Sequence, residues 1–229
     1  MQKDSRKTIY AGVNFVFAPT PNLGMENRLE FQRMSEEIGI QLTEFRLEGN
    51  RFISLRRTSM PIEVLIGVTA PQIGQIRIVA PEMGARSLGG FASEADDIVE
   101  IFSRIWPAHQ IIACDATIRD LYDASGQHAF QELWEGRLHQ PQNSIGALNR
   151  PVLGGGLRLV MPPTSEDPSD PLVELKIESY LKDTKKFFIE AQFQWQRPQP
   201  PGAKLDPENR LITVDNFIQN ETLNFIMEA

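Results

Sequence analysis

Hydrophobic and polar residues alternate along several short segments of this chain, as they do in strands that bury one face. The clearest pair is residues 173–177 and 187–195, where apolar residues alternate with Glu, Lys and Gln. A polar KDTKK segment separates the two, so the pattern predicts a β-hairpin. Similar pairs meet at EGN and at APQIG, between residues 44 and 80, and they predict an antiparallel meander.

Two other segments complete the predicted sheet. Residues 8–17 are almost continuously apolar and end before two prolines, which is typical of a strand buried on both faces. Residues 111–119 alternate, with Cys114 on the apolar side and Asp115 and Arg119 on the polar side. Cys114 is therefore predicted to be a core thiol rather than a nucleophile.

Helical spacing of apolar residues appears in four places. Residues 91–106 carry the clearest apolar stripe, and the pattern predicts a helix there that Ser93 caps. Further helices are predicted over 25–38 and 127–138, together with a last helix that Thr213 caps. The helices are interspersed with the predicted strands along the chain.

Together these elements predict an α+β fold, with a curved, mostly antiparallel sheet and helices packed on one face. We interpret residues 1–229 as a single α+β domain. The order of elements in residues 1–108 resembles that in residues 109–229, although no residue-level repeat accompanies it. Two pseudo-repeated halves are thus inferred from the predicted elements alone.

The charge balance bears on the class of partner. The chain has 30 acidic and 23 basic residues and a net charge of −7. Such a balance disfavours functions that neutralise many phosphates, so we expect no nucleic-acid binding. Arg51, Arg56 and Arg57 form the densest basic group, but glutamates lie near them in sequence. We interpret this group as solvated surface.

Cysteine usage and hydropathy bear on the compartment. The chain has one cysteine, which cannot form an internal disulfide, and MQKDSRKTIY lacks the apolar run of a secretory signal. No apolar run approaches the ~20 residues that span a bilayer. We therefore expect a cytoplasmic protein that is not inserted into a membrane.

Gly154, Gly155 and Gly156 raise the question of a phosphate-binding loop. Such loops lead from a strand into the N-terminus of a helix, whose amides hold the anion. Here the glycines precede an extended segment, and neither Lys-Ser nor Lys-Thr follows. We interpret them as a strand entry with a close backbone approach, and we expect no nucleotide or other cofactor.

Candidate chemistry is sparse. No CxxC, HxxxH or HExxH spacing occurs, so no metal site is predicted. The remaining candidate is an acid–base site on the polar side of residues 111–119. Asp115 would be the base, His128 its partner, and Arg119 or Arg158 would hold an anionic substrate. The competing interpretation is an ordinary charged strand face in contact with water.

The lack of recognisable catalytic chemistry favours a non-catalytic protein-binding or assembly protein, whose partner is another protein or a second copy of the chain. An enzyme that acts on a small anionic substrate at Asp115 is the alternative. The interface candidates are Phe188, Glu190 and Gln192, because Phe188 places a large apolar side chain on a polar strand face. Long strands with uncovered edges invite pairing, so a homodimer is the simplest case.

Overall fold

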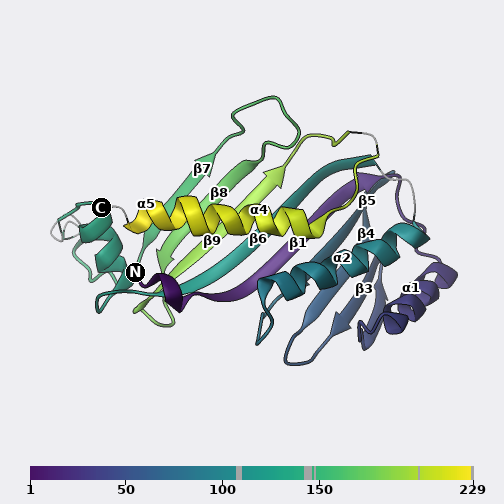
Figure 1. Cartoon of the computed structure of the whole chain (residues 1–229), viewed down its shortest axis with the longest axis horizontal. Coiled ribbons are helices and arrows are strands. Elements are labelled where there is room, and N and C mark those ends of the chain that lie inside the picture. Colours follow the sequence, from purple (N-terminus) through teal and green to yellow (C-terminus); the bar gives the residue numbers. More distant parts are fainter. Residues whose placement is uncertain (107–109, 142–145, 147, 201, 228–229) are drawn as a thin grey trace.

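An open antiparallel sheet extends through the molecule (Figure 1). The computed structural model describes residues 1–106, 110–141, 146, 148–200 and 202–227. Within these residues the sheet has nine strands in the order β2-β3-β4-β5-β1-β6-β9-β8-β7. The strands are β1 (Lys7–Ala18), β2 (Glu44–Glu48), β3 (Arg51–Arg56), β4 (Ile62–Ala70), β5 (Ile73–Ala80), β6 (Gln110–Asp123), β7 (Gly156–Met161), β8 (Leu172–Ser179) and β9 (Lys186–Trp195).

Helices lie on one side of this sheet, as Figure 1 shows for α1, α2 and α4. The helical segments are η1 (Lys3–Ser5), α1 (Met25–Glu37), α2 (Leu88–Ile105), α3 (Ala129–Gln131), η2 (Glu132–Arg137), α4 (Pro207–Phe217), η4 (Ile218–Thr222) and α5 (Leu223–Met227). The predicted α+β class, with a curved antiparallel sheet and helices, is confirmed.

The β1–β6 pair lies near the centre of the strand order, with four strands beyond β1 and three beyond β6. From β1 the sheet continues through β5, β4, β3 and β2, and from β6 it continues through β9, β8 and β7. Along the chain, β1 is followed by α1 and β6 by α3. The helix α2 follows β5, and α4 follows β9. Strands from residues 1–108 and 109–229 therefore share one continuous sheet.

Alternation within the strands separates a core face from an open face. On the core face, Phe17 of β1 contacts Phe102 of α2, and Phe193 of β9 contacts Phe217 of α4, each pair with ring centroids 5.3 Å apart. On the other face of β1, Asn14 is only partly buried. The prediction that this strand is buried on both faces is thus wrong, because the helices pack against one face of the sheet.

Two helices begin earlier than predicted. Ser87, not Ser93, caps α2, and its hydroxyl oxygen accepts the Gly90 amide at 3.0 Å. Asp206, not Thr213, caps α4 by accepting the Asn209 amide at 3.0 Å. Each helix therefore starts on the N-terminal side of the cap that was predicted. A side chain that accepts a hydrogen bond from one of the first free amides allows the helix to begin there.

The triple glycine leads directly into β7, as predicted. A Cβ on Gly156 would lie 2.1 Å from the backbone oxygen of Ile177, and one on Gly154 would lie 2.3 Å from the Ser179 hydroxyl oxygen. The Gly155 amide donates to that same hydroxyl at 3.1 Å. These positions require glycine because β8 approaches too closely for a side chain. That the segment binds no nucleotide stays a prediction, which titration with ATP, GTP and NAD tests.

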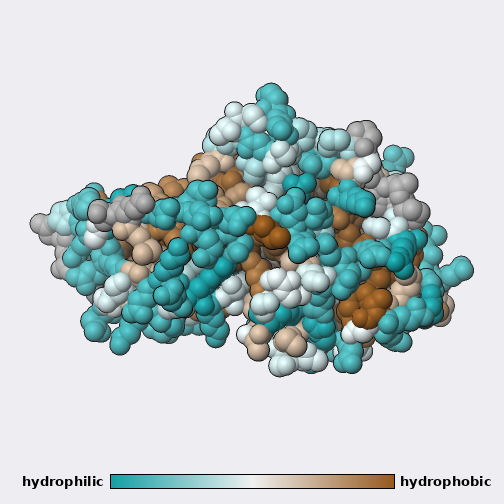
Figure 2. Space-filling view, viewed as in Figure 1, coloured by the Kyte–Doolittle hydropathy of each residue, from teal (hydrophilic) through white to brown (hydrophobic). Residues whose placement is uncertain are grey.

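The side of the molecule that carries the helices is mainly hydrophilic, and hydrophobic residues show there in separate patches (Figure 2). None of the helices formed by the described residues has the length and apolar character needed to cross a membrane.

Candidate functional site

A hollow lies on the open face of the sheet, on the side away from the helices. Its volume is about 540 Å³, within the range of about 300–1,000 Å³ typical of ligand sites. Side chains of seven strands form it, and we call it the open-face hollow. Its lining residues are Tyr10, Asn14, Arg51, Leu65, Gln75, Arg77, Asp115, Thr117, Arg119, Lys176, Glu190 and Gln192.

Strand register brings these polar side chains together. Asn14 of β1 pairs with Arg77 of β5 on one side and with Asp115 of β6 on the other. Two same-face rows further along the sheet, Arg119 of β6 pairs with Glu190 of β9. Because alternate residues of a strand point to the same face, the predicted polar side of β6 forms the centre of the hollow.

Glu190 is the central carboxylate of a cross-strand ion-pair network. It accepts hydrogen bonds from Arg119 Nε and from Lys176 Nζ, each at 2.5 Å. Burial of the carboxylate works against its charge, but the two cations outweigh burial and lower the pKa of Glu190. The Arg119 guanidinium also lies over the Tyr10 ring, 4.4 Å from its centroid. The hydrogen bonds to Glu190 thereby hold Arg119 and Lys176 in place.

The network continues to the edge of the sheet, away from the hollow. Glu174 accepts from Arg158 at 2.9 Å and lies 3.3 Å from Lys176. Arg158 is on edge strand β7, and its side chain is 63% exposed. Arg158 is therefore not among the residues that line the hollow and is paired with Glu174, and its anion-holding role stays a prediction.

Asp115 lies at the floor of the hollow. Burial raises the pKa of Asp115 above its ordinary value. Hydrogen bonds from the Asn14 and Gln192 side chains and the positive charge of Arg77 oppose that shift. The Asn14 amide nitrogen is 2.9 Å from Asp115 Oδ2. These contacts hold the carboxylate in one orientation on the sheet.

Arg51 and Arg77 differ from the other cations of the hollow. Both are exposed, and within the described part of the chain neither side chain has an ion-pair or hydrogen-bond partner. The Arg51 stem lies over Gly67, where a Cβ would be 3.2 Å from Arg51 Cγ. The hollow thus has four basic and two acidic side chains, in a chain whose net charge is −7.

His128 does not join this site. It precedes α3 and lines a separate pocket of about 340 Å³ with Phe130 and Trp134. The strand alternation that aligned Asp115 with Arg119 carried no information about where the later helical segment lies. The proposed Asp115–His128 pair is therefore not formed.

The three interface candidates lie on the open face, two of them inside the hollow. Glu190 and Gln192 line it. Phe188 is near the start of the same strand and stacks on Tyr180, with ring centroids 6.5 Å apart, so its own chain covers part of it. β9 lies between β6 and β8, so the hairpin offers no free edge through β9, and pairing there is ruled out.

Sequence reasoning missed several residues of the hollow, among them Asn14, Arg51, Arg77 and Lys176. Arg77 alternates with buried isoleucines in QIRIV, and that signal was sufficient to place it on the open face. The sequence could not predict that Arg77 lies near Asp115. Their strands, β5 and β6, are remote in sequence and lie on either side of β1.

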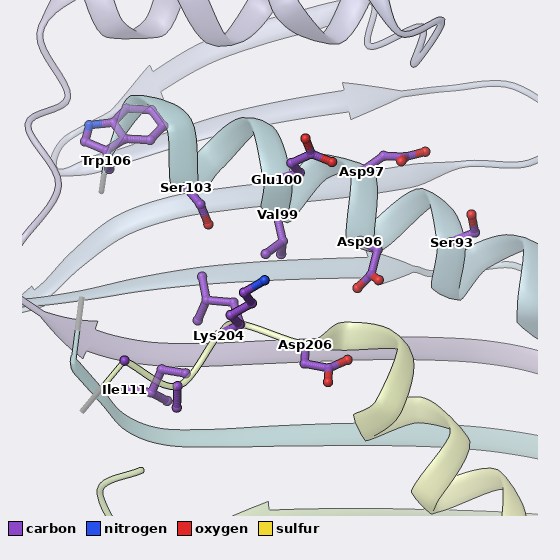
Figure 3. Close-up of a pocket in the computed structure, with 13 residues that line it drawn as sticks. Ser93, Asp96, Asp97, Val99, Glu100, Ser103, Trp106, Ile111, Lys204 and Asp206 are labelled. Carbon is purple, nitrogen blue, oxygen red and sulfur yellow. The ribbon is translucent and has the colours of Figure 1, made fainter. Parts of the chain in front are cut away.

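A second, acidic groove of about 860 Å³ lies between α2 and the segment before α4 (Figure 3). Asp96 points from α2 toward the start of α4, near Asp206, and Lys204 reaches toward α2. Burial, followed by the charges of Asp206 and other neighbouring acids, raises the pKa of Asp96. Its side chain accepts the Glu208 amide at 3.3 Å, so the carboxylate already has a structural partner.

Nucleophile and metal chemistry have little support in the described residues. No group of three or more His, Cys, Asp and Glu side chains there is arranged to hold a metal ion. Cys114 is 3% exposed on the core face, and burial raises the pKa of its thiol to about 11. The thiol is therefore protonated at neutral pH, as the predicted core role requires.

Comparison with protein-family models gives no match, and comparison with curated proteins gives none either.

Proposed function

We propose that this protein is a non-catalytic protein-binding or assembly protein that uses the open face of its sheet. The observation that carries the proposal is the open-face hollow itself. It is formed by side chains of seven strands, and the helices lie on the opposite side of the sheet. A concave, polar and rigidly supported surface of this kind is suited to holding a partner in a defined orientation.

The enzyme alternative has one observation in its favour, the raised pKa of Asp115 inside the hollow. Acid–base catalysis also uses a second protein group within reach of the substrate, which donates a proton as the general acid. The other carboxylate of the hollow, Glu190, is bound by two cations, and His128 lines another pocket. Binding is therefore the function that the arrangement supports better.

Photocrosslinking followed by reconstitution tests the proposal. A photoreactive phenylalanine analogue replaces Gln192 in the hollow, or Ile212 on the exposed side of α4 as a control. The protein crosslinked in the source cell is identified and purified. Its affinity is then measured for the unmodified chain, for Gln192→Trp and for Ile212→Trp.

Gln192→Trp fills the hollow with a bulky side chain, so we expect the affinity to fall by about tenfold or more. Ile212→Trp leaves the hollow open and keeps the affinity. Equal affinities for the three chains, or an adduct formed only from position 212, would contradict the proposal. Circular dichroism of each variant shows whether the fold is retained.

A further inference from the structure

We infer that the occupant of the open-face hollow is a short, acidic, extended segment of another protein, held by Arg51 and Arg77. This inference rests on the proposed function and adds the chemistry of the partner. The arrangement of charge in the hollow carries it, because among the described residues neither guanidinium has a hydrogen bond or an ion pair, although the charge of Arg77 acts on Asp115.

The two guanidiniums stand on one side of the hollow. Arg51 is on β3 and Arg77 on β5, with β4 between them. On the opposite side, Arg119 and Lys176 each already form an ion pair with Glu190. An incoming carboxylate therefore finds its free donors at Arg51 and Arg77, where planar guanidiniums bind carboxylates in a bidentate manner.

The floor of the hollow favours a peptide as the carrier of those carboxylates. Gln75, Thr117 and Gln192 offer amide and hydroxyl groups, which donate to and accept from peptide groups. Leu65 and the Tyr10 ring add apolar surface. The backbone of a segment that crosses the strands can thus form hydrogen bonds with the floor, while its acidic side chains form ion pairs with the two arginines.

A short acidic segment fits better than a long polyanion. Glu63 and Glu178 face the same side of the sheet as the hollow, by their pairing with Val79 and Phe188. Glu174 is there too, at the edge of the ion-pair network. A nucleic acid that extended past the hollow would meet these carboxylates and a chain of net charge −7, which oppose phosphate binding.

The test uses a fluorescein-labelled peptide with a central run of glutamates, and matched peptides with glutamine or lysine in the same places. Binding is followed by fluorescence anisotropy at low and moderate salt. The chains compared are the unmodified protein, the double variant Arg51→Gln and Arg77→Gln, and the control Arg104→Gln. Arg104 is on α2 and pairs with Glu100, away from the open face.

We expect the glutamate peptide to bind best, and its affinity to fall by about tenfold or more in the double variant. The control variant keeps the affinity. Thermal melts show whether the double variant is folded. The inference is overturned if the lysine or glutamine peptide binds equally well, if the double variant binds like the control, or if no peptide binds at about 1 mM.

Two further outcomes assign another occupant and overturn the inference. One is a homodimer, detected by light scattering, that the double variant abolishes. The other is an oligothymidylate probe that binds more tightly than the glutamate peptide and depends on Arg51 and Arg77. The two proposals can be told apart. If Gln192→Trp weakens binding of the partner protein but the glutamate peptide does not bind, the proposed function stands and only the chemistry inferred for the partner is rejected.

Discussion

Asp120 is a buried carboxylate on the core face of β6, with no exposed side-chain surface. Arg6 reaches it from the segment before β1, with Arg6 Nη2 2.9 Å from Asp120 Oδ2, and also contacts Asp215 of α4 at 2.6 Å. Burial raises the pKa of Asp120, while the charge of Arg6 opposes that shift. One arginine therefore joins the N-terminal segment, the sheet and a helix.

Substitution Arg6→Met leaves Asp120 buried without its cation. We expect the free energy of unfolding to fall by about 3 kcal/mol at pH 7, because an unpaired buried charge is costly. In the variant, the folded-state pKa of Asp120 lies further above its unfolded value. The deficit is therefore largest above that folded pKa and shrinks as pH falls through it. Urea unfolding at several pH values measures this.

Arg33→Met is the matched control, because its pairs with Glu30 and Glu37 are exposed on α1. Exposed pairs contribute little to stability, because water and salt screen them. A loss in Arg6→Met no larger than the loss in this control would contradict a buried ion-pair network.

Glu190 differs from Asp120 in that its folded-state pKa is lowered rather than raised. Its stabilising effect is present above the unfolded pKa and is lost as pH falls through the folded pKa. We expect Glu190→Gln to lower the free energy of unfolding by about 1.5 kcal/mol at pH 7. The difference between the two chains therefore narrows as pH falls through the lowered folded-state pKa of Glu190. A difference that does not change with pH would contradict this role.

The N-terminus of α2 is the best place to test an element boundary. Ser87→Ala removes the hydroxyl that accepts the Gly90 amide, so we expect a loss of about 1 kcal/mol in unfolding free energy. Ser93 is the cap that the apolar periodicity predicted. We expect Ser93→Ala to alter the free energy of unfolding by less than about 0.5 kcal/mol. Chemical denaturation of both variants distinguishes the two caps, and a larger loss in Ser93→Ala would contradict the observed helix start.

The entry of β7 gives a second test at this scale. Gly156→Ala forces a methyl group against the β8 backbone, so we expect about 2 kcal/mol of destabilisation from overpacking. A Cβ on Gly89, in the first turn of α2, would have nothing within 4 Å, so Gly89→Ala is the control and is neutral or slightly stabilising. Thermal melts compare them, and a neutral Gly156→Ala would show that the two strands separate easily.

At the scale of the whole molecule, the position of each strand in the sheet sets its protection from solvent. β1 and β6 are central, whereas β2 and β7 each have one unpaired edge. We expect amide hydrogen exchange to be slowest in β1 and β6 and fastest in β2 and β7. Exchange measured by mass spectrometry at two protein concentrations tests this. Concentration-dependent protection of β2 or β7 would instead indicate self-association at an edge.

The sequence by itself determined the local features. Alternation predicted the hairpins on either side of the sheet, and it placed Asp115 and Arg119 on one face with Cys114 on the other, because the period of a strand is a property of the backbone. The glycines before β7 were also readable as a strand entry. Helix starts were not located well, since an apolar stripe reports which side of a helix is buried rather than where its first amide is capped.

Only the tertiary structure decided which segments meet. Strand pairing across about one hundred residues places β6 beside β1, and thereby Arg77 near Asp115. The same pairing leaves His128 in another pocket and puts β9 inside the sheet. Register between distant strands depends on how the whole core packs, and no local period encodes it. The open-face hollow, and the two arginines that have no ion pair among the described residues, therefore exist only in the folded chain.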